Sequence, residues 1–193
     1  MKKIVIGLVG RMGSGKSTVG NMILEGREGD VIKFSDILHW TLVLYGIEHS
    51  TKNLQILSTI LRQNFGEDLL TNVIAGRIYD ITAEFIIVDG VCRSVDVAML
   101  KSLEDEGIGV ALFFVHRSRQ KRFDAIQQGR NEKTDNQVTW EEFQKKDDQE
   151  CELQIDMLGY TDDIYICDID NNGSLEQLKK EVETKVKEVI SKM

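Results

Sequence analysis

The clearest chemistry in the chain lies near its N-terminus, where glycines, a lysine and two hydroxyl residues stand close together. The segment from Gly10 to Thr18 reads GRMGSGKST and fits the pattern G-x-x-x-x-G-K-[ST]. Glycines allow a tight turn that brings several backbone N–H groups close to one anion. The segment therefore predicts a phosphate-binding loop, whose contacts to a bound nucleotide would come from Gly10, Met12, Gly13, Ser14, Gly15, Lys16, Ser17 and Thr18.

Two side chains of this loop would do more than bind. Lys16 carries a positive charge that can reach the β- and γ-phosphates, so we expect it to be catalytic. The Ser17 hydroxyl is a hard oxygen ligand of the kind that Mg²⁺ prefers. A plain glycine-rich turn before a helix is the alternative, but a buried strand precedes the loop and a helix follows it.

A candidate partner for Ser17 follows a continuous apolar run, Phe85–Val88, which is typical of a central parallel strand. Asp89 comes directly after this run. An aspartate at a strand end beside a phosphate loop can hold Mg²⁺ directly or through water. An aspartate that caps the next helix is the alternative interpretation. We expect Ser17 and Asp89 to form the metal site, and Asp89 to be catalytic.

The segment from His116 to Lys133 holds six basic side chains against two acidic ones, in a chain whose net charge is −8. Positive charge after a strand end suits a mobile lid that excludes water and stabilises a transferring phosphoryl group. A solvated basic helix face is the alternative. Arg122 and Arg130 are the best catalytic candidates, because Gly129 followed by Arg130 resembles a hinge.

Arg93 stands four residues beyond Asp89, where its guanidinium could grip a second phosphate in bidentate fashion. A solvated loop arginine is the alternative. The segment Asn131–Asp135 does not match N-K-x-D, so the guanine-reading motif of small GTPases is missing. No histidine has a partner at metal-ligand spacing, so we predict no metal site other than that for Mg²⁺.

The elements that must position these residues alternate between apolar strands and amphipathic helices, which indicates a parallel α/β sheet with five strands. In such sheets, ligands bind at the carboxyl ends of the strands. The predicted strands are Lys3–Val9, Val31–Phe34, Phe85–Val88, Gly109–Val115 and Ile164–Cys167.

Helices are expected after the phosphate loop, from Ser94 to Glu106, from Trp140 after a Thr139 cap, and after a Ser174 cap. Ser35 or Asp36 would cap the first of several helices in a long insertion. We therefore expect a single domain: a core of residues 1–34, 84–116 and 148–193, an acceptor-binding insertion at 35–83, and a lid at 117–147.

Composition narrows the class of protein. Of the 193 residues, 41% are hydrophobic and 29% charged, which fits a soluble globular domain, and no apolar run approaches a membrane span. The net charge of −8 disfavours a nucleic-acid surface. Three cysteines without a C-x-x-C pair indicate neither a disulfide framework nor a zinc site. With no signal peptide in view, we expect a cytoplasmic protein.

At these motifs the sequence resembles the nucleoside monophosphate kinase group of P-loop kinases, including adenylate kinase and dephospho-coenzyme A kinase, and most closely uncharacterised microbial kinase-like ATPases of this group. Gly10–Ser17 matches the family's phosphate loop, and Asp89–Arg93 is similar to its D-G-x-P-R segment, with Cys92 in place of proline. Arg117–Arg130 resembles the arginine-bearing lid. The resemblance implies ATP and Mg²⁺ as cofactors, and an acceptor phosphate bound by Arg93.

The resemblance extends to two further segments. Asn171–Ser174 is similar to the loop before the last helix, whose backbone lies against adenine in the family, so Gly173 is a candidate nucleotide contact. Ser35–His39 resembles the acceptor-site segment D-x-L-R, but His39 stands where arginine would bind the acceptor phosphate. Arg62, on a later helix of the insertion, could substitute for it. Dephospho-coenzyme A kinases use an aspartate near this point for the acceptor hydroxyl, which keeps Asp36 as a candidate base.

Three functions remain open from the sequence. The first is ATP-dependent phosphoryl transfer to a small acceptor, a nucleoside or deoxynucleoside monophosphate. The second is a dephospho-coenzyme A kinase, and the third is a nucleotide-binding regulatory ATPase without an acceptor. A phosphate acceptor needs arginines in the insertion, whereas a hydroxyl acceptor needs a base such as Asp36.

Overall fold

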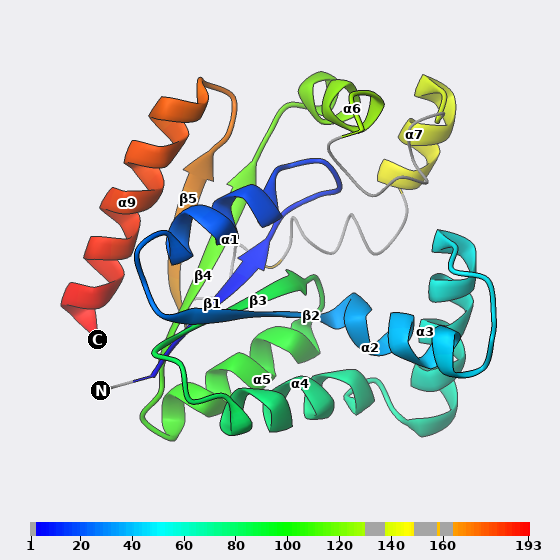
Figure 1. The fold of residues 1–193 in the computed structure, drawn as a ribbon, viewed down its shortest axis with the longest axis horizontal. Helices are drawn as coiled ribbons and strands as arrows, with labels where there is room; N and C mark the ends of the chain where they lie inside the picture. Colours follow the sequence, from blue (N-terminus) through cyan, green and yellow to red (C-terminus); the bar gives the residue numbers. More distant parts are fainter. Residues whose placement is uncertain (1–2, 130–137, 149–157, 159–163) are drawn as a thin grey trace.

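The computed structural model describes residues 3–129, 138–148, 158 and 164–193. Five strands form one sheet in the order β2-β3-β1-β4-β5, and every neighbouring pair is parallel. The predicted five-stranded parallel sheet is confirmed (Figure 1). The strands are β1 Ile4–Val9, β2 Gly29–Lys33, β3 Phe85–Val91, β4 Gly109–His116 and β5 Tyr165–Asp170.

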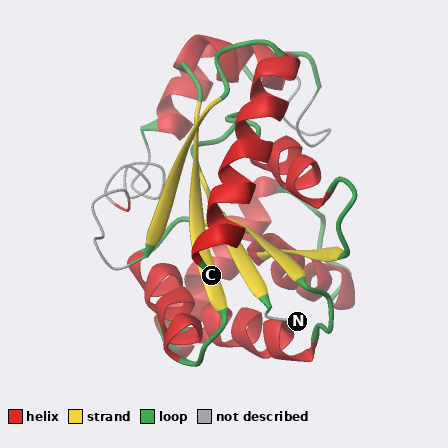
Figure 2. Cartoon of the chain, turned by 90° about the vertical axis from the view of Figure 1, so that its left-hand side faces the viewer, coloured by secondary structure: helices red, strands yellow, loops and turns green. Residues whose placement is uncertain are grey.

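Helices cover both faces of the sheet, with α1 and α9 on one side and α4 and α5 on the other (Figures 1 and 2). Three helices, α2 to α4, fill the predicted insertion between β2 and β3. The helices are α1 Lys16–Leu24, α2 Phe34–Leu44, α3 Thr51–Phe65, α4 Leu69–Asp80, α5 Ser94–Asp105, α6 Arg119–Gln127, α7 Trp140–Asp147 and α9 Leu175–Lys192.

The buried strand β1 divides its side chains between two apolar cores. Val5 and Val9 belong to the core that includes residues of α2, α4 and α5, whereas Ile6 and Leu8 belong to the core that includes residues of α1 and α9. This alternation follows from the period of two residues in a strand. Because β1 lies in the centre of the sheet and is buried on both faces, the loop at its end starts from a rigid base.

Helix starts were predictable where a capping box is present. Thr139 accepts the Glu142 N–H and Ser174 accepts the Gln177 N–H, as the sequence predicts. The predicted cap of α2 is wrong. This helix begins at Phe34 with Lys33 as its N-cap and no side-chain cap, because β2 runs directly into it. Asp36 therefore lies within the first turn, where a negative charge is favourable near the helix N-terminus.

Strand ends also differ from the sequence prediction. β3 continues past Val88 to Val91, so Asp89 lies within the last part of the strand and not after it. β5 extends to Asp170 although its last residues alternate between buried and exposed. An edge strand with one solvent-facing side has no continuous apolar run. The sequence pattern therefore predicted only the first half of β5.

Candidate functional site

The phosphate loop connects β1 to α1 at the carboxyl edge of the sheet (Figure 1). Gly15 is the N-cap of α1 and has φ of 98°, a left-handed conformation that side-chain-bearing residues rarely adopt. A Cβ atom on Gly15 would also collide with the side-chain amide of Asn171. Helix α1 thus begins directly at the loop, and its N-terminal N–H groups and dipole favour an anion there.

The first two residues of α1 are the predicted lysine and serine. The Lys16 ammonium donates to the Gly10 carbonyl at 2.6 Å and to the Arg11 carbonyl at 3.3 Å, so it lies against the loop that it is expected to serve. The Ser17 hydroxyl donates to Asp89 Oδ2 at 3.1 Å, although 72 residues separate the two in the chain. The structure therefore brings together the residues predicted for the donor and metal sites.

The pair of Ser17 and Asp89 has the chemistry that Mg²⁺ requires. Both offer oxygen atoms, and Mg²⁺ takes one or two protein oxygens and completes its octahedron with water and substrate phosphates. Asp89 is only 8% exposed and pairs with Leu8 across the central strands, so its position is fixed by the sheet. The residues present fit this metal, and a bound magnesium ion would supply charge neutralisation beside the phosphate loop.

Side chains from two other segments hold the phosphate loop through its carbonyl groups. Arg117 lies between β4 and α6, Arg122 belongs to α6, and Asn171 comes from the loop between β5 and α9. The hydrogen bonds are Arg122 Nη1 to Met12 O at 3.1 Å, Arg117 Nη1 to Gly13 O at 3.4 Å, and Asn171 Nδ2 to Ser14 O at 2.7 Å.

A buried carboxylate, Asp147 of α7, fixes one of these arginines. It is 0% exposed and receives two hydrogen bonds from Arg122, at 2.6 and 2.8 Å. Arg119 Nε lies 2.8 Å from Asp147 Oδ2, and Arg11 Nη1 of the phosphate loop lies 3.4 Å from the same oxygen. Burial alone would raise the pKa of Asp147, but the hydrogen bonds and charge of Arg122, with the charges of Arg11 and Arg119, outweigh it and lower the pKa.

These contacts bear directly on the predicted lid arginines. A lid arginine would be expected to reach a bound phosphate, but Arg122 is 3% exposed and its fork is occupied by Asp147. In this conformation the Arg122 guanidinium donates to the Met12 carbonyl of the phosphate loop. A direct contact with a transferring phosphoryl group would require the buried ion pair to separate. Arg130, the second predicted lid arginine, lies outside the described residues.

The two arginines predicted to bind an acceptor, Arg62 and Arg93, come to one carboxylate in the structure. Arg93 Nη1 lies 3.4 Å from Glu67 Oε2, and Arg62 Nη1 lies 3.8 Å from the same oxygen. Arg62 is 8% exposed and also donates to the Glu67 carbonyl at 3.1 Å. Arg62 belongs to α3 of the insertion and Arg93 follows β3, so the pairing joins the two segments that the sequence singled out.

The backbone around Arg93 is held by a second buried acid, Asp96. Its Oδ2 accepts the N–H groups of Cys92 at 3.0 Å and Arg93 at 2.9 Å. Burial raises the pKa of the Asp96 carboxyl, and these hydrogen bonds and the charges of Arg62 and Arg93 oppose that rise. Asp96 therefore sets the direction in which the chain leaves β3, and with it the place of Arg93.

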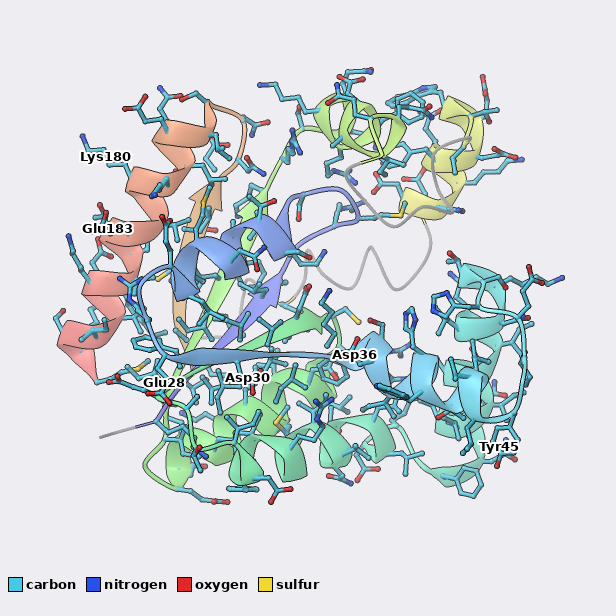
Figure 3. The ribbon with its side chains drawn as sticks, in the orientation of Figure 1. Glu28, Asp30, Asp36, Tyr45, Lys180 and Glu183 are labelled. Atoms are coloured by element: carbon cyan, nitrogen blue, oxygen red, sulfur yellow. The ribbon has the colours of Figure 1, made fainter. Side chains whose placement is uncertain are left out.

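The remaining acceptor candidates lie on α2. Asp36 stands at the start of this helix, where β2 ends (Figure 3). His39 lies one turn further along, and its ring packs against the ring of His49, with centroids 3.9 Å apart. Among the residues that the structure describes, the ring partner of His39 is thus another histidine of the insertion. The residue that lies with Arg93 at the Glu67 carboxylate is Arg62.

The loop between β5 and α9 approaches the phosphate loop from the β4 and β5 side of the sheet. Asn171 N donates to His116 O at 2.8 Å, and Asn172 Oδ1 accepts the Ser118 N–H at 2.9 Å. These bonds fasten the predicted adenine-side segment to the end of β4. Gly173 follows them directly and precedes the Ser174 cap of α9, so its backbone lies at this junction.

Sequence reasoning missed Asp147, Glu67 and the contact made by Asn171. Asp147 lies 25 residues from Arg122, and no periodicity connects a carboxylate on one short helix with an arginine on another. Glu67 stands in the turn between α3 and α4, where an exposed acid is ordinary. Asn171 was assigned to the adenine-side loop, but its bond to Ser14 joins residues 157 positions apart and leaves no local sequence signal.

Comparisons with known proteins agree with the fold. No family model matches the chain. It is 26% identical to a UPF0200 protein from Thermococcus kodakarensis, over 98% of this chain and 100% of that protein. It is 29% identical to a UPF0200 protein from Hyperthermus butylicus over 75% of this chain and 74% of that protein.

Among solved structures, the chain is similar to a shikimate kinase from Acinetobacter baumannii in complex with shikimate, with a TM-score of 0.57 and 18% identity. That alignment covers 97% of this chain and 93% of the other. A gluconokinase from Sinorhizobium meliloti gives a TM-score of 0.56 and 19% identity, and the alignment again covers 97% of this chain and 93% of the other. The structural neighbours are P-loop kinases, and the chain has the fold of such kinases.

In the part of the chain that the structure describes, no helix is long and apolar enough to cross a membrane.

Proposed function

We propose that the protein transfers a phosphoryl group from ATP, with Mg²⁺, to a small anionic acceptor, a nucleoside or deoxynucleoside monophosphate. The observation that carries the proposal is the hydrogen bond between Ser17 and Asp89, because it joins a complete phosphate loop to a strand-end aspartate. The same strand leads to Arg93, which lies with Arg62 on the acceptor side.

On the donor side, each residue has a distinct task. The N–H groups of the phosphate loop and the Lys16 ammonium would bind the β- and γ-phosphates of ATP. Ser17 and Asp89 would hold the metal between them, and Gly173 would offer backbone to the adenine. Lys16 would release the loop carbonyls that it now contacts and turn to the phosphates, a change within reach of a flexible side chain.

On the acceptor side, Arg62 and Arg93 would bind the phosphate of the acceptor. Two guanidinium groups that already converge on one carboxylate, that of Glu67, can converge on another anion. A nucleoside monophosphate would then take the place of the Glu67 carboxylate and present its own oxygens to the donor. In this arrangement, Arg62 would take the role of the arginine that the resembling kinases have at the position of His39.

A specific observation also favours a second candidate, phosphorylation of a hydroxyl group as in dephospho-coenzyme A kinase. Asp36 stands in the first turn of α2, beside the carboxyl end of β2, where it could accept the proton of an acceptor hydroxyl. The neighbouring structures include a gluconokinase and a shikimate kinase, so gluconate and shikimate belong among the acceptors to be tested. A regulatory ATPase without an acceptor is the third candidate.

The decisive experiment is a panel of acceptors with ATP and Mg²⁺, read as ADP formation. It would contain nucleoside and deoxynucleoside monophosphates, dephospho-coenzyme A, gluconate and shikimate, with a Lys16→Ala variant as the control for contaminating kinases. We expect one class of monophosphate to stimulate ADP formation strongly. Stimulation by a hydroxyl acceptor alone would favour the second candidate. ATP binding without stimulation by any acceptor would favour the regulatory ATPase.

A further inference from the structure

Three successive carbonyl groups of the phosphate loop, those of Met12, Gly13 and Ser14, accept hydrogen bonds from side chains outside the loop. The donors come from two segments, around α6 and before α9, that lie more than 100 residues further along the chain. Contacts to carbonyls do not bind an anion themselves, so through these bonds the side chains act on the loop.

Because of peptide geometry, a carbonyl group that is held in place also fixes the direction of the N–H group of the next residue. The peptide unit is planar and trans, so the carbonyl of one residue and the N–H of the next point in opposite directions. Fixing the Met12 carbonyl therefore fixes the Gly13 N–H, and fixing the Ser14 carbonyl fixes the Gly15 N–H. Both residues are glycines with positive φ, 79° and 98°, and glycine has more rotational freedom to lose than any other residue.

Arg122 can serve as an anchor because it is itself immobilised. Two of its N–H groups are held by Asp147 at 2.6 and 2.8 Å, Nε donates to the Arg117 carbonyl at 3.2 Å, and the guanidinium lies 5.5 Å from the centroid of the Phe143 ring. The remaining bond, to Met12 O, is then made from a fixed point. Helix α6 also lies close to the loop, since a Cβ on Gly13 would come within 2.8 Å of the Arg122 carbonyl.

We propose that Arg122 and Asn171 are positioning residues that aim the Gly13 and Gly15 N–H groups of the phosphate loop at a bound polyphosphate, and that Asp147 keeps Arg122 in place for this purpose. This inference rests on the phosphate-binding half of the proposed function. It gives Arg122 a role different from that of a lid arginine, because Arg122 acts through the backbone of the loop and need not touch the phosphates.

The two roles predict opposite signs for one substitution, Asp147→Asn. If Arg122 and its neighbours act on the phosphates directly through their charge, removing a nearby negative charge should strengthen binding of a polyanion. If Asp147 holds Arg122 for the loop, the same substitution loosens the anchor and should weaken binding. We expect about a tenfold loss of affinity, as for a hydrogen bond that involves a charged group. The probes are Mg·ADP and inorganic tripolyphosphate, measured by titration calorimetry.

Three further variants complete the test. Arg122→Lys keeps the charge but loses the fork, so it should lose about as much affinity as Asp147→Asn. Asn171→Ala changes no charge at all, and we expect a loss of about threefold to tenfold for one neutral hydrogen bond. Lys145→Ala is the matched control, because Lys145 is exposed on α7, the helix that carries Asp147, and its side chain has no hydrogen bond to a loop carbonyl among the described residues. This control should stay within about twofold of the wild type.

Each outcome bears on one claim. Tighter binding in Asp147→Asn, or wild-type affinity in both Arg122→Lys and Asn171→Ala, would overturn the positioning role while leaving the donor site intact. Failure of the wild-type protein to bind either probe would instead overturn the proposed function. Thermal unfolding of every variant shows whether it is folded at the titration temperature. If Asp147→Asn is not, the uncharged change Asn171→Ala decides alone.

Discussion

At the scale of single residues, the proposed donor site would depend most on the charge of Lys16. Its ammonium lies against the Gly10 and Arg11 carbonyls, at the loop where phosphate charge would be neutralised. We predict that Lys16→Ala removes most phosphoryl transfer and leaves the fold intact, with a rate loss of about 10²–10³, typical for one lost electrostatic contact in a transition state. Steady-state ADP formation and far-UV circular dichroism together measure this. Wild-type turnover in the variant would contradict the donor-site assignment.

A second prediction at this scale concerns pH. The carboxyl of Asp147 has a lowered pKa in the folded protein, because the hydrogen bonds and charges of its arginine partners outweigh the effect of burial. A lowered pKa means that ionised Asp147 stabilises the fold above the pKa of an unfolded aspartate, about 3.9, and that this contribution is lost as the pH falls through the lower folded value. Removing one partner of a buried ion pair costs about 3–5 kcal/mol.

The measurement is the free energy of urea unfolding of the wild type and of Asp147→Asn between pH 7 and pH 3. We expect the wild type to be more stable at pH 7, and the difference to shrink as the pH falls below about 4. Below the folded pKa, both proteins carry a neutral side chain at this position beside a charged Arg122. A difference that stayed constant across the whole range would show that the ionisation of Asp147 does not stabilise the fold.

At the scale of elements, α6 and α7 form a small unit of their own. Phe123 of α6 contacts Trp140 of α7 edge-on, with ring centroids 5.0 Å apart, and Trp140 lies 5.6 Å from Phe143. The sequence predicted a lid over residues 117–147, and this aromatic cluster would report its movement. The chain contains only one other tryptophan, Trp40, which is 73% exposed on α2.

We predict that nucleotide binding changes the fluorescence of Trp140 in a Trp40→Phe variant. A lid that closes over a polyphosphate alters the packing of Trp140 against α6 or its exposure to water. The matched variant Trp140→Phe keeps Trp40 and reports on the insertion in the same titration. An unchanged Trp140 signal, at Mg·ADP concentrations that calorimetry shows to be saturating, would mean that α6 and α7 form a fixed wall and not a lid.

The same elements show which structural features could be predicted from the sequence. Local signals predicted the phosphate loop, the five strands and the capping boxes at Thr139 and Ser174, because each depends on neighbours within a few residues. Two features of the structure had no local signal of this kind. The start of α2 was misplaced because a strand can run directly into a helix without a cap, and the burial of Arg122 depends on Asp147, which only the fold brings near.

At the scale of the whole molecule, the order of strands explains how donor and acceptor would meet. β3 lies between β2 and β1, so Asp89 and Arg93 stand between the phosphate loop after β1 and Asp36 after β2. All three segments leave the sheet at its carboxyl edge, where parallel strands place their ligands. A phosphoryl group would therefore move along this edge, from the phosphate loop toward the insertion formed by α2, α3 and α4 (Figure 1).

The last prediction uses this arrangement to separate the two kinase functions. The phosphate of a monophosphate acceptor is already anionic at neutral pH and needs no general base. Arg93→Ala should then raise the acceptor KM strongly, and Asp36→Asn should cost comparatively little in kcat. Arg77→Ala, at an exposed arginine of α4, is the matched control and should change neither constant. A hydroxyl acceptor must instead lose its proton during transfer, and general-base help is worth about 10²–10⁴ in rate. A collapse of kcat in Asp36→Asn, with dephospho-coenzyme A as the best acceptor, would overturn the monophosphate proposal, because only a hydroxyl acceptor makes the reaction depend on that carboxylate.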